Sequence, residues 1–338
     1  MQEVRRGHPR GTFDAHAGSH SLRSLLLTHV PSRGMPHGTR THRLFSAAAV
    51  LALVVAGMCG CDVSRWDPGA PEVIEVSSYD LVTEAAQGSA SHRVEEVWIY
   101  SATDVLGVYP LPAKVALPSG SPQTLALVPG IRANGVAASR RPYPFYEVNE
   151  VTVDGDPSTA EVHDFGGGYV DNGVLTTKVI LAEDFESANR FVAGSNSNAE
   201  VIRITQPDQV FEGGGSGYIR LDSTQTQLSA ATNEQLYNLP RDRPVYLEFN
   251  YKCDVSFLVG LDVLGGSQAG RLVILGLNPT CEADGECIWK KMYLDLFPVL
   301  SSMPDAQAFE ISLNASILAD GSEGNIWIDN FKFVHFAD

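Results

Sequence analysis

The cysteines are the residues of this 338-residue chain whose spacing most directly indicates chemistry. Cys59 and Cys61 stand directly behind an apolar run of fifteen residues, 44–58, and Arg40 and Arg43 precede that run. A basic segment followed by an apolar run of about 7–15 residues is typical of a secretory signal, and a membrane-spanning helix would need roughly 20 residues. The sequence therefore predicts export, with thiol chemistry at the point of cleavage.

The segment resembles a bacterial lipobox, in which small residues precede a cysteine that is lipidated and becomes the mature N-terminus. Gly60 places a small residue before Cys61, so Cys61 is the expected lipidation site. Cys59 is the alternative and would require cleavage behind Met58. The resemblance implies a lipid-anchored protein of the bacterial cell envelope, at the outer membrane. An ordinary signal peptide or a single-span anchor would produce a similar apolar run.

The remaining three cysteines can form disulfides in an exported protein. Cys281 and Cys287 bracket the short polar loop 282–286, so they can close it, and such a small loop would contribute about 2 kcal/mol in the chain-entropy model. Cys253 would then stay unpaired. Pairings that involve Cys253 remain open, because three cysteines allow more than one partner choice.

Charge excludes one class of partner. The chain has 24 basic and 40 acidic residues, and the first 60 residues hold seven of the basic and two of the acidic ones. The rest of the chain therefore has 17 basic and 38 acidic residues, a net charge of −21. Such a surface repels phosphates, so we expect no nucleic-acid partner. Only His92, His163 and His335 follow the signal, and a histidine-rich metal site is therefore not expected.

The organisation of the chain follows from composition and periodicity. Residues 1–34 lack apolar periodicity and are expected to be disordered or absent from the translated protein. Residues 35–60 form the signal, expected to be helical, and 61–92 are polar and read as a tether. From Val94 the pattern is that of short strands with turn signals. We predict an all-β fold with a small β-sandwich over 93–175 and a larger β-sandwich or jelly roll over 176–338.

One aromatic segment has two interpretations. Residues 140–146, Arg-Arg-Pro-Tyr-Pro-Phe-Tyr, could form an exposed stacking surface for a sugar or a peptide. Alternatively, the three rings close the edge of the first sandwich or the seam between the two sandwiches. Proline-rich aromatic segments commonly end β-domains in this second way, which is the interpretation favoured here.

Two resemblances suggest what the sandwiches are. Residues 97–129 resemble PEGA-like surface β-modules. Ala182-Glu183-Asp184-Phe185-Glu186-Ser187 and Ile326-Trp327-Ile328-Asp329-Asn330-Phe331 resemble the opening and closing elements of galactose-binding-like, carbohydrate-binding jelly rolls. That second resemblance implies neighbouring first and last strands and a structural calcium, the one cofactor expected. Its implied ligands are Glu183, Asp184, Glu186 and Asp329. The alternative is that these acids only cap turns.

Sugar binding would also need exposed rings. Tyr246 and Trp289 have polar or charged neighbours and are the candidate platforms, whereas Trp327 lies on a strand with two apolar faces and is expected in the core. No zinc-protease motif, phosphate-binding loop or dinucleotide-binding motif is present. The sequence therefore favours a non-catalytic envelope protein that binds a glycan or another envelope component. The alternatives are a structural subunit of a surface assembly and, more remotely, a glycan-cleaving enzyme.

Overall fold

The computed structural model of the chain describes residues 70–118, 120–158, 160–318 and 322–337. The predicted signal and both candidate lipidation sites lie outside these residues. The described residues belong to one compact unit. Their helices are limited to η2 (Ala85–Gln87), η3 (Ala133–Gly135) and α2 (Phe297–Ser301), and none of them has the length and apolar character needed to cross a membrane.

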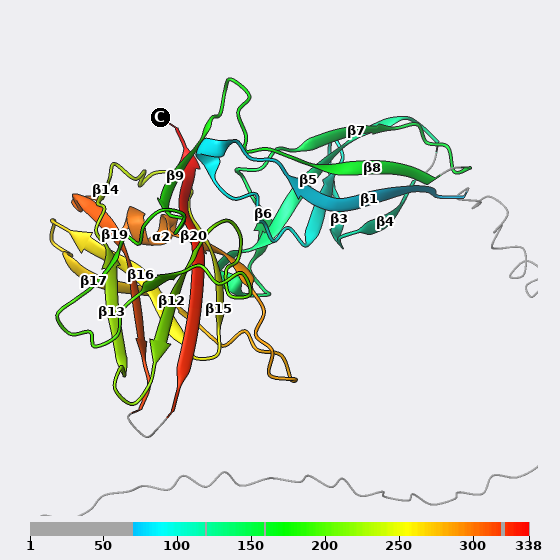
Figure 1. Cartoon of the computed structure of the whole chain (residues 1–338). Coiled ribbons are helices and arrows are strands. Elements are labelled where there is room, and N and C mark those ends of the chain that lie inside the picture. Colours follow the sequence, from blue (N-terminus) through cyan, green and yellow to red (C-terminus); the bar gives the residue numbers. More distant parts are fainter. Residues whose placement is uncertain (1–69, 119, 159, 319–321, 338) are drawn as a thin grey trace, which may run out of the picture. The chain divides into compact units, whose positions relative to one another are not determined.

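Two sheets build the N-terminal sandwich (Figure 1). One has the strand order β4–β1–β8, and the other has the order β3–β2–β5–β6 with β7 also paired to β5. The strands are β1 (Glu72–Leu81), β2 (Glu96–Tyr100), β3 (Val105–Pro110), β4 (Ala113–Leu117), β5 (Gln123–Arg132), β6 (Arg140–Pro142), β7 (Asn149–Val153) and β8 (Ala160–Gly167). Alternate residues of these strands point inward and form a shared core with the rings of 143–146.

Strand β1 corrects the predicted tether. The assignment of 61–92 to a tether is wrong over Glu72–Leu81, because these residues pair antiparallel with β4 and parallel with β8. Ile74 and Val76 are at most 1% exposed, as expected of the inward face of a strand. The serines at 77 and 78, which suggested a linker, fall at a bulge where the register with β8 shifts.

The C-terminal sandwich has two six-stranded sheets. The first has the order β10–β13–β19–β16–β17 with β14 on β19, and the second has the order β11–β12–β20–β15–β18 with β9 on β20. The strands are β9 (Thr177–Glu183), β10 (Phe191–Ala193), β11 (Ile202–Ile204), β12 (Ser216–Leu221), β13 (Gln227–Thr232), β14 (Leu236–Tyr237), β15 (Val245–Cys253), β16 (Phe257–Leu264), β17 (Gly270–Leu277), β18 (Lys290–Asp295), β19 (Ala308–Ser316) and β20 (Gly324–Phe336). The predicted all-β fold, a smaller sandwich followed by a larger one, is confirmed.

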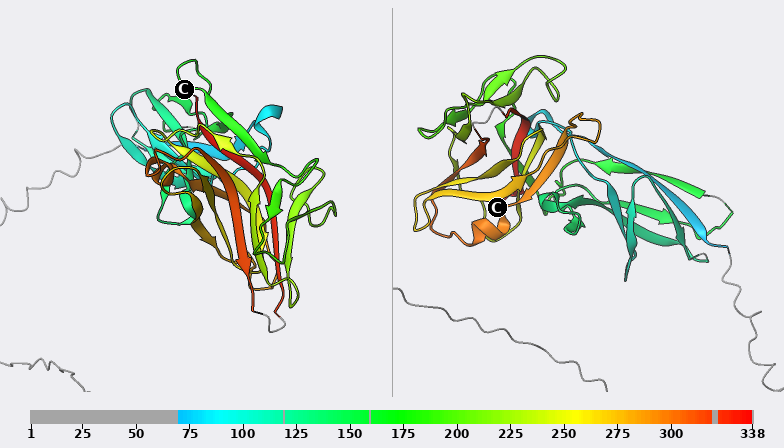
Figure 2. Two further views of the ribbon diagram at one scale, coloured as in Figure 1. Left: turned by 90° about the vertical axis from the view of Figure 1, so that its left-hand side faces the viewer. Right: turned by 90° about the horizontal axis from the view of Figure 1, so that it is seen from below.

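The opening and closing strands are neighbours, as the jelly-roll resemblance implied. Strand β9 pairs antiparallel with the second half of β20, and β20 lies between β12 and β15. The red strand β20 can be followed beside its green neighbour β12 in Figure 1 and again in Figure 2. Because β20 is central, both of its edges are satisfied by hydrogen bonds, and its side chains alone decide what each face contacts.

The two sandwiches share a buried seam. Alternate residues of β15, β18 and β20 face away from the C-terminal core yet are buried: Tyr246, Glu248, Tyr293, Lys332 and Val334. They meet the rings of Tyr143, Phe145 and Tyr146, each at most 1% exposed. The rings of 140–146 therefore close the seam, and the alternative of an exposed stacking surface is wrong.

Candidate functional site

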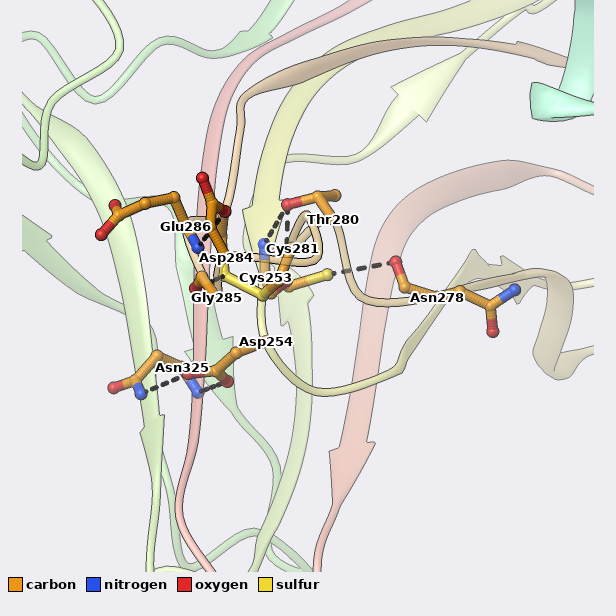
Figure 3. The surroundings of a disulfide bond; sticks show 10 residues. Cys253, Asp254, Asn278, Thr280, Cys281, Asp284, Gly285, Glu286 and Asn325 are labelled. Atoms are coloured by element: carbon orange, nitrogen blue, oxygen red, sulfur yellow. Dashed lines mark hydrogen bonds between the residues drawn. A yellow bond between two sulfur atoms is a disulfide. The ribbon is translucent and has the colours of Figure 1, made fainter.

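A short disulfide loop follows β17 and is fixed to the end of β15. Cys281 and Cys287 are joined by a disulfide. The preceding residue, Thr280, exchanges hydrogen bonds with Cys253: Thr280 N donates to the Cys253 carbonyl at 2.8 Å, and Cys253 N donates to Thr280 Oγ1 at 3.1 Å (Figure 3). Cys253 is buried with a free thiol, and burial raises its pKa to about 12. These contacts position the residues that follow the loop, including Trp289.

Trp289 lies in a row of rings and one cation across the outer face of the β12–β20–β15 sheet. The Lys252 ammonium stands 4.5 Å from the Trp327 ring centroid and 5.4 Å from that of Trp289. Phe211 contacts Trp289 with ring centroids 5.1 Å apart, and Tyr218 contacts Trp327 at 5.4 Å. Trp327 is half-buried in this row rather than in the core. The cation–π contacts hold both indole rings in place.

A hollow of about 260 Å³ opens beside Trp289. Its wall is formed by Trp289, Phe211 and Ile288 on the apolar side and by polar side chains of 91–93, Asn250 and 290–291 on the other. The hollow is smaller than the roughly 300–1,000 Å³ of common ligand pockets, which suits a ligand of about one ring. It combines an aromatic wall with convergent polar groups.

Asn250 lines this hollow and has one side-chain atom without a partner. Its side chain is 2% exposed, and its Nδ2 donates to Ser91 Oγ at 2.8 Å. Its Oδ1 is buried and has no hydrogen-bond partner. A buried amide oxygen without a partner costs about 1–3 kcal/mol, and this amide belongs to the residues that line the hollow.

His92 supplies a donor at the same wall. Burial lowers the pKa of His92, and the charge of Lys291 lowers it further, while the carboxylates of Asp80 and Glu248 raise it by less. The ring is therefore neutral at pH 7. The Val94 N–H donates to His92 Nδ1 at 3.3 Å, so Nε2 carries the hydrogen. Acceptor, donor and indole ring thus line one small space.

A second hollow, of about 610 Å³, lies over the outer face of the other sheet. Its wall includes five carboxamide and hydroxyl side chains beside apolar residues: Gln227, Ser256, Asn278, Asn314 and Ser316. Asn314 Nδ2 is buried without a partner, while its Oδ1 accepts from Arg271 at 3.0 Å. The one ring in this wall, Phe257, is only 2% exposed. This amide trough has polar groups without an aromatic platform.

Of the two predicted platforms, only Trp289 lines a hollow. Tyr246 is 3% exposed because the N-terminal sandwich covers its face of β15. The Tyr143 ring packs edge-on against it with centroids 5.3 Å apart, and Arg141 donates to its hydroxyl at 3.4 Å. The prediction of Tyr246 as an exposed platform is therefore wrong. Its charged neighbour on the same face of the strand, Glu248, is itself buried in the seam.

Three of the predicted calcium ligands accept hydrogen bonds from backbone N–H groups. They lie at and just after the end of β9, the first strand of the C-terminal sandwich. Glu183, 3% exposed, accepts from Phe185 N at 2.7 Å and from Arg190 N. Asp184 accepts from Glu186 N at 3.2 Å, and Glu186 accepts from Gly214 N at 2.9 Å. These are the turn-capping roles that the alternative interpretation described.

Asp329, the fourth predicted ligand, is 1% exposed on β20. It accepts from Ser216 Oγ at 2.5 Å and from Asn330 N at 2.8 Å. Burial raises its pKa to about 7, and the carboxylates of Glu212 and Glu186 add to the rise. Among the described residues, the four predicted ligands do not gather three carboxylate oxygens within 4.8 Å of one another. Calcium at this place stays a prediction.

Sequence reasoning missed the partners of Trp289. Strand periodicity places Asn250 on the outward face of 245–253 together with Glu248 and Lys252, so an amide there is not distinctive, and His92 falls in the predicted tether. The contact between 91–93 and β15 spans about 160 residues and leaves no local pattern in the sequence.

The structure is similar to several solved carbohydrate-binding proteins. One is a carbohydrate-binding module of the β-sandwich superfamily: identity 10%, coverage 80% of this chain and 100% of that one, TM-score 0.36. Another is the family 11 carbohydrate-binding module of a cellulosomal cellulase of Clostridium thermocellum. Its sequence identity is 12%, the match covers 46% of this chain and 94% of that one, and the TM-score is 0.32. A third is an arabinose-bound α-L-arabinofuranosidase. Its sequence identity is 11%, the match covers 48% of this chain and 27% of that one, and the TM-score is 0.34. Similarities at this level do not transfer a ligand or a site. No protein-family model and no curated protein sequence matches the chain.

Proposed function

We propose that this protein is a non-catalytic glycan-binding protein whose ligand occupies the hollow beside Trp289. The observation that carries the proposal is the indole ring of Trp289 at the wall of a hollow that polar side chains, Asn250 and His92 among them, also line. A sugar ring has an apolar face that packs on an aromatic side chain and hydroxyls that both donate and accept.

The groups around the hollow match that chemistry. Trp289 would contact the apolar face of the sugar, while the polar side chains beside it, including His92, would form hydrogen bonds with its hydroxyls. The volume of about 260 Å³ favours a single sugar residue or a chain end over a long polysaccharide.

A glycan array probed with the full chain, with calcium and with a chelator, tests this function. We expect a set of related sugars to bind. Trp289→Ala should then weaken binding about fivefold or more, because stacking on an aromatic ring contributes on the order of 1 kcal/mol beyond buried area. Thermal unfolding of the variant checks that the fold is retained.

The amide trough provides the matched control. Asn314→Ala removes a carboxamide of that trough and should leave binding unchanged. Binding that is lost in Asn314→Ala but kept in Trp289→Ala would retain the function and move the site to the trough. An array without any specific binding would overturn the proposal and favour the alternative of a structural subunit with protein partners.

We also propose that the protein is exported and held at the outer membrane of a bacterial envelope by lipid on Cys61, with Cys59 as the alternative. The support is the apolar run 44–58 with its basic flank and the small residue Gly60. The mass of the N-terminal peptide from the membrane fraction tests it: an acylated Cys61 is expected, and an unmodified terminus would contradict it.

A further inference from the structure

Three carboxylates meet at one end of the N-terminal sandwich. Glu72 is the first residue of β1, Glu161 lies on the adjacent strand β8, and Asp154 follows β7 in the facing sheet (Figure 1). One carboxylate oxygen of each lies within 4.8 Å of the others. Glu72 shares the inward face of β1 with Ile74, and the buried Glu72, the half-buried Glu161 and the exposed Asp154 meet where the two sheets end.

Glu72 has an oxygen that no protein group satisfies. Its side chain is 0% exposed. Oε1 accepts from Gly155 N at 3.1 Å, whereas Oε2 is buried and has no hydrogen-bond partner. A charged oxygen removed from water without a partner is among the more costly features of a fold. The unused oxygen therefore indicates a ligand that the carboxylate is built to hold.

The charges of the three acids are not balanced by the described protein. None of the three forms a salt bridge with a lysine or arginine among the described residues; Glu161 lies 3.4 Å from His163 Nε2. Three carboxylates within 5 Å repel one another strongly when they are shielded from water. A cation between them would reverse the sign of this interaction.

We propose that Glu72, Asp154 and Glu161 bind a divalent cation of the calcium type. Calcium takes six to eight oxygens at roughly 2.3–2.6 Å, so two oxygens across one ion lie up to about 5 Å apart, which fits the observed spacing. An all-carboxylate set without thiolates disfavours soft transition metals. The ion would join the start of β1 to β8 and to the turn after β7, and water or backbone oxygens would complete its shell.

Calorimetric titration of the full chain, first stripped with a chelator, tests the proposal. CaCl2 up to about 10 mM covers the roughly 0.1–1 mM affinities of extracellular calcium sites. Glu161→Gln and Asp154→Asn should each lose one bound calcium per chain and the accompanying rise in melting temperature. In chelator, both variants should melt above the wild type, because they relieve repulsion. Glu150→Gln, an exposed carboxylate on β7, should behave as the wild type.

Two variants, Glu161→Gln and Asp154→Asn, are used so that the test still holds if one of them fails to fold. Each possible result supports or overturns the proposed site. Loss of one calcium in both variants, with Glu150→Gln unaffected, supports the site. Wild-type calcium binding in both variants, or no binding to the wild type, overturns it. Calcium binding that survives in both but disappears in Asp329→Asn assigns the ion to β20 instead. The proposal does not depend on the glycan ligand.

Discussion

Asp329 is a carboxyl group that the fold forces into an unusual protonation equilibrium. Burial, with the charges of Glu212 and Glu186, raises its pKa to about 7 from an unfolded value near 4. Because the folded state holds the proton more tightly, the folded state loses stability as the pH rises from about 4 to about 7. Below pH 4 both states are protonated and this effect is absent.

Replacing Asp329 with asparagine should remove this pH dependence. Asparagine can still accept from Asn330 N and can donate to Ser216 Oγ. In chelator, we expect Asp329→Asn to be more stable than the wild type at pH 8 by up to about 4 kcal/mol, and similar to it at pH 4. Urea unfolding at the two pH values measures this. Glu200→Gln, at an exposed position, is the control, and equal pH slopes for wild type and Asp329→Asn would contradict the prediction.

For single residues, the sequence shows which side chains have polar neighbours, but it does not show which side chains are exposed. Both Tyr246 and Trp289 have polar neighbours, yet Tyr246 is buried and Trp289 lines a hollow. The difference arises because the N-terminal sandwich covers one end of the β15 face and leaves the other end open. Sequence periodicity shows which residues share a face of a strand but not what covers that face.

Among the strands, those with clear alternation were predicted almost to their ends. Residues 245–253 alternate strictly between apolar Val245, Leu247, Phe249 and Tyr251 and more polar residues, which predicts a strand, and they form β15 with the same bounds. The prediction failed for Glu72–Leu81, because prolines and serines around a strand resemble a linker and a bulge interrupts the alternation. The glycine run 166–168 likewise predicts a loop, whereas β8 continues to Gly167.

The difference between tether and strand can be measured with two valines. Val76 on β1 is 1% exposed and Val162 on the adjacent strand β8 is 71% exposed. Val76→Ala should lower the free energy of unfolding by about 2 kcal/mol, from two lost methyl groups and the space they leave. Val162→Ala should change it by less than about 0.5 kcal/mol. Equal effects of the two substitutions, measured by urea unfolding, would be incompatible with a buried β1.

Across the whole molecule, Glu248 joins the two sandwiches. It is fully buried on β15 and accepts from the hydroxyls of Tyr143 at 2.5 Å and Tyr169 at 3.2 Å. Lys291 Nζ lies 3.1 Å from it and Lys332 Nζ 3.8 Å. Burial alone would raise the pKa of Glu248, but the two ammonium groups and the tyrosine hydrogen bond lower it. The carboxylate is therefore ionised and balanced within the seam.

Removing this carboxylate should destabilise the molecule as a unit. Glu248→Ala leaves two buried ammonium groups without a counter-charge, which typically costs about 3–5 kcal/mol. We expect one cooperative transition at a lower urea concentration, with tyrosine and tryptophan signals moving together. Glu200→Ala on the surface provides the comparison. Two separate transitions in the wild type would show that the seam does not couple the sandwiches.

The position of β1 also has a mechanical consequence. The chain enters the fold at Glu72, in the middle strand of a three-stranded sheet, with β4 and β8 on its two sides. Tension arriving along the preceding segment is therefore shared between two ladders of hydrogen bonds, instead of peeling one edge strand. An ion on Glu72 would add a clamp at the residue where the load enters, so the resistance of the protein to pulling would depend on the calcium concentration around it.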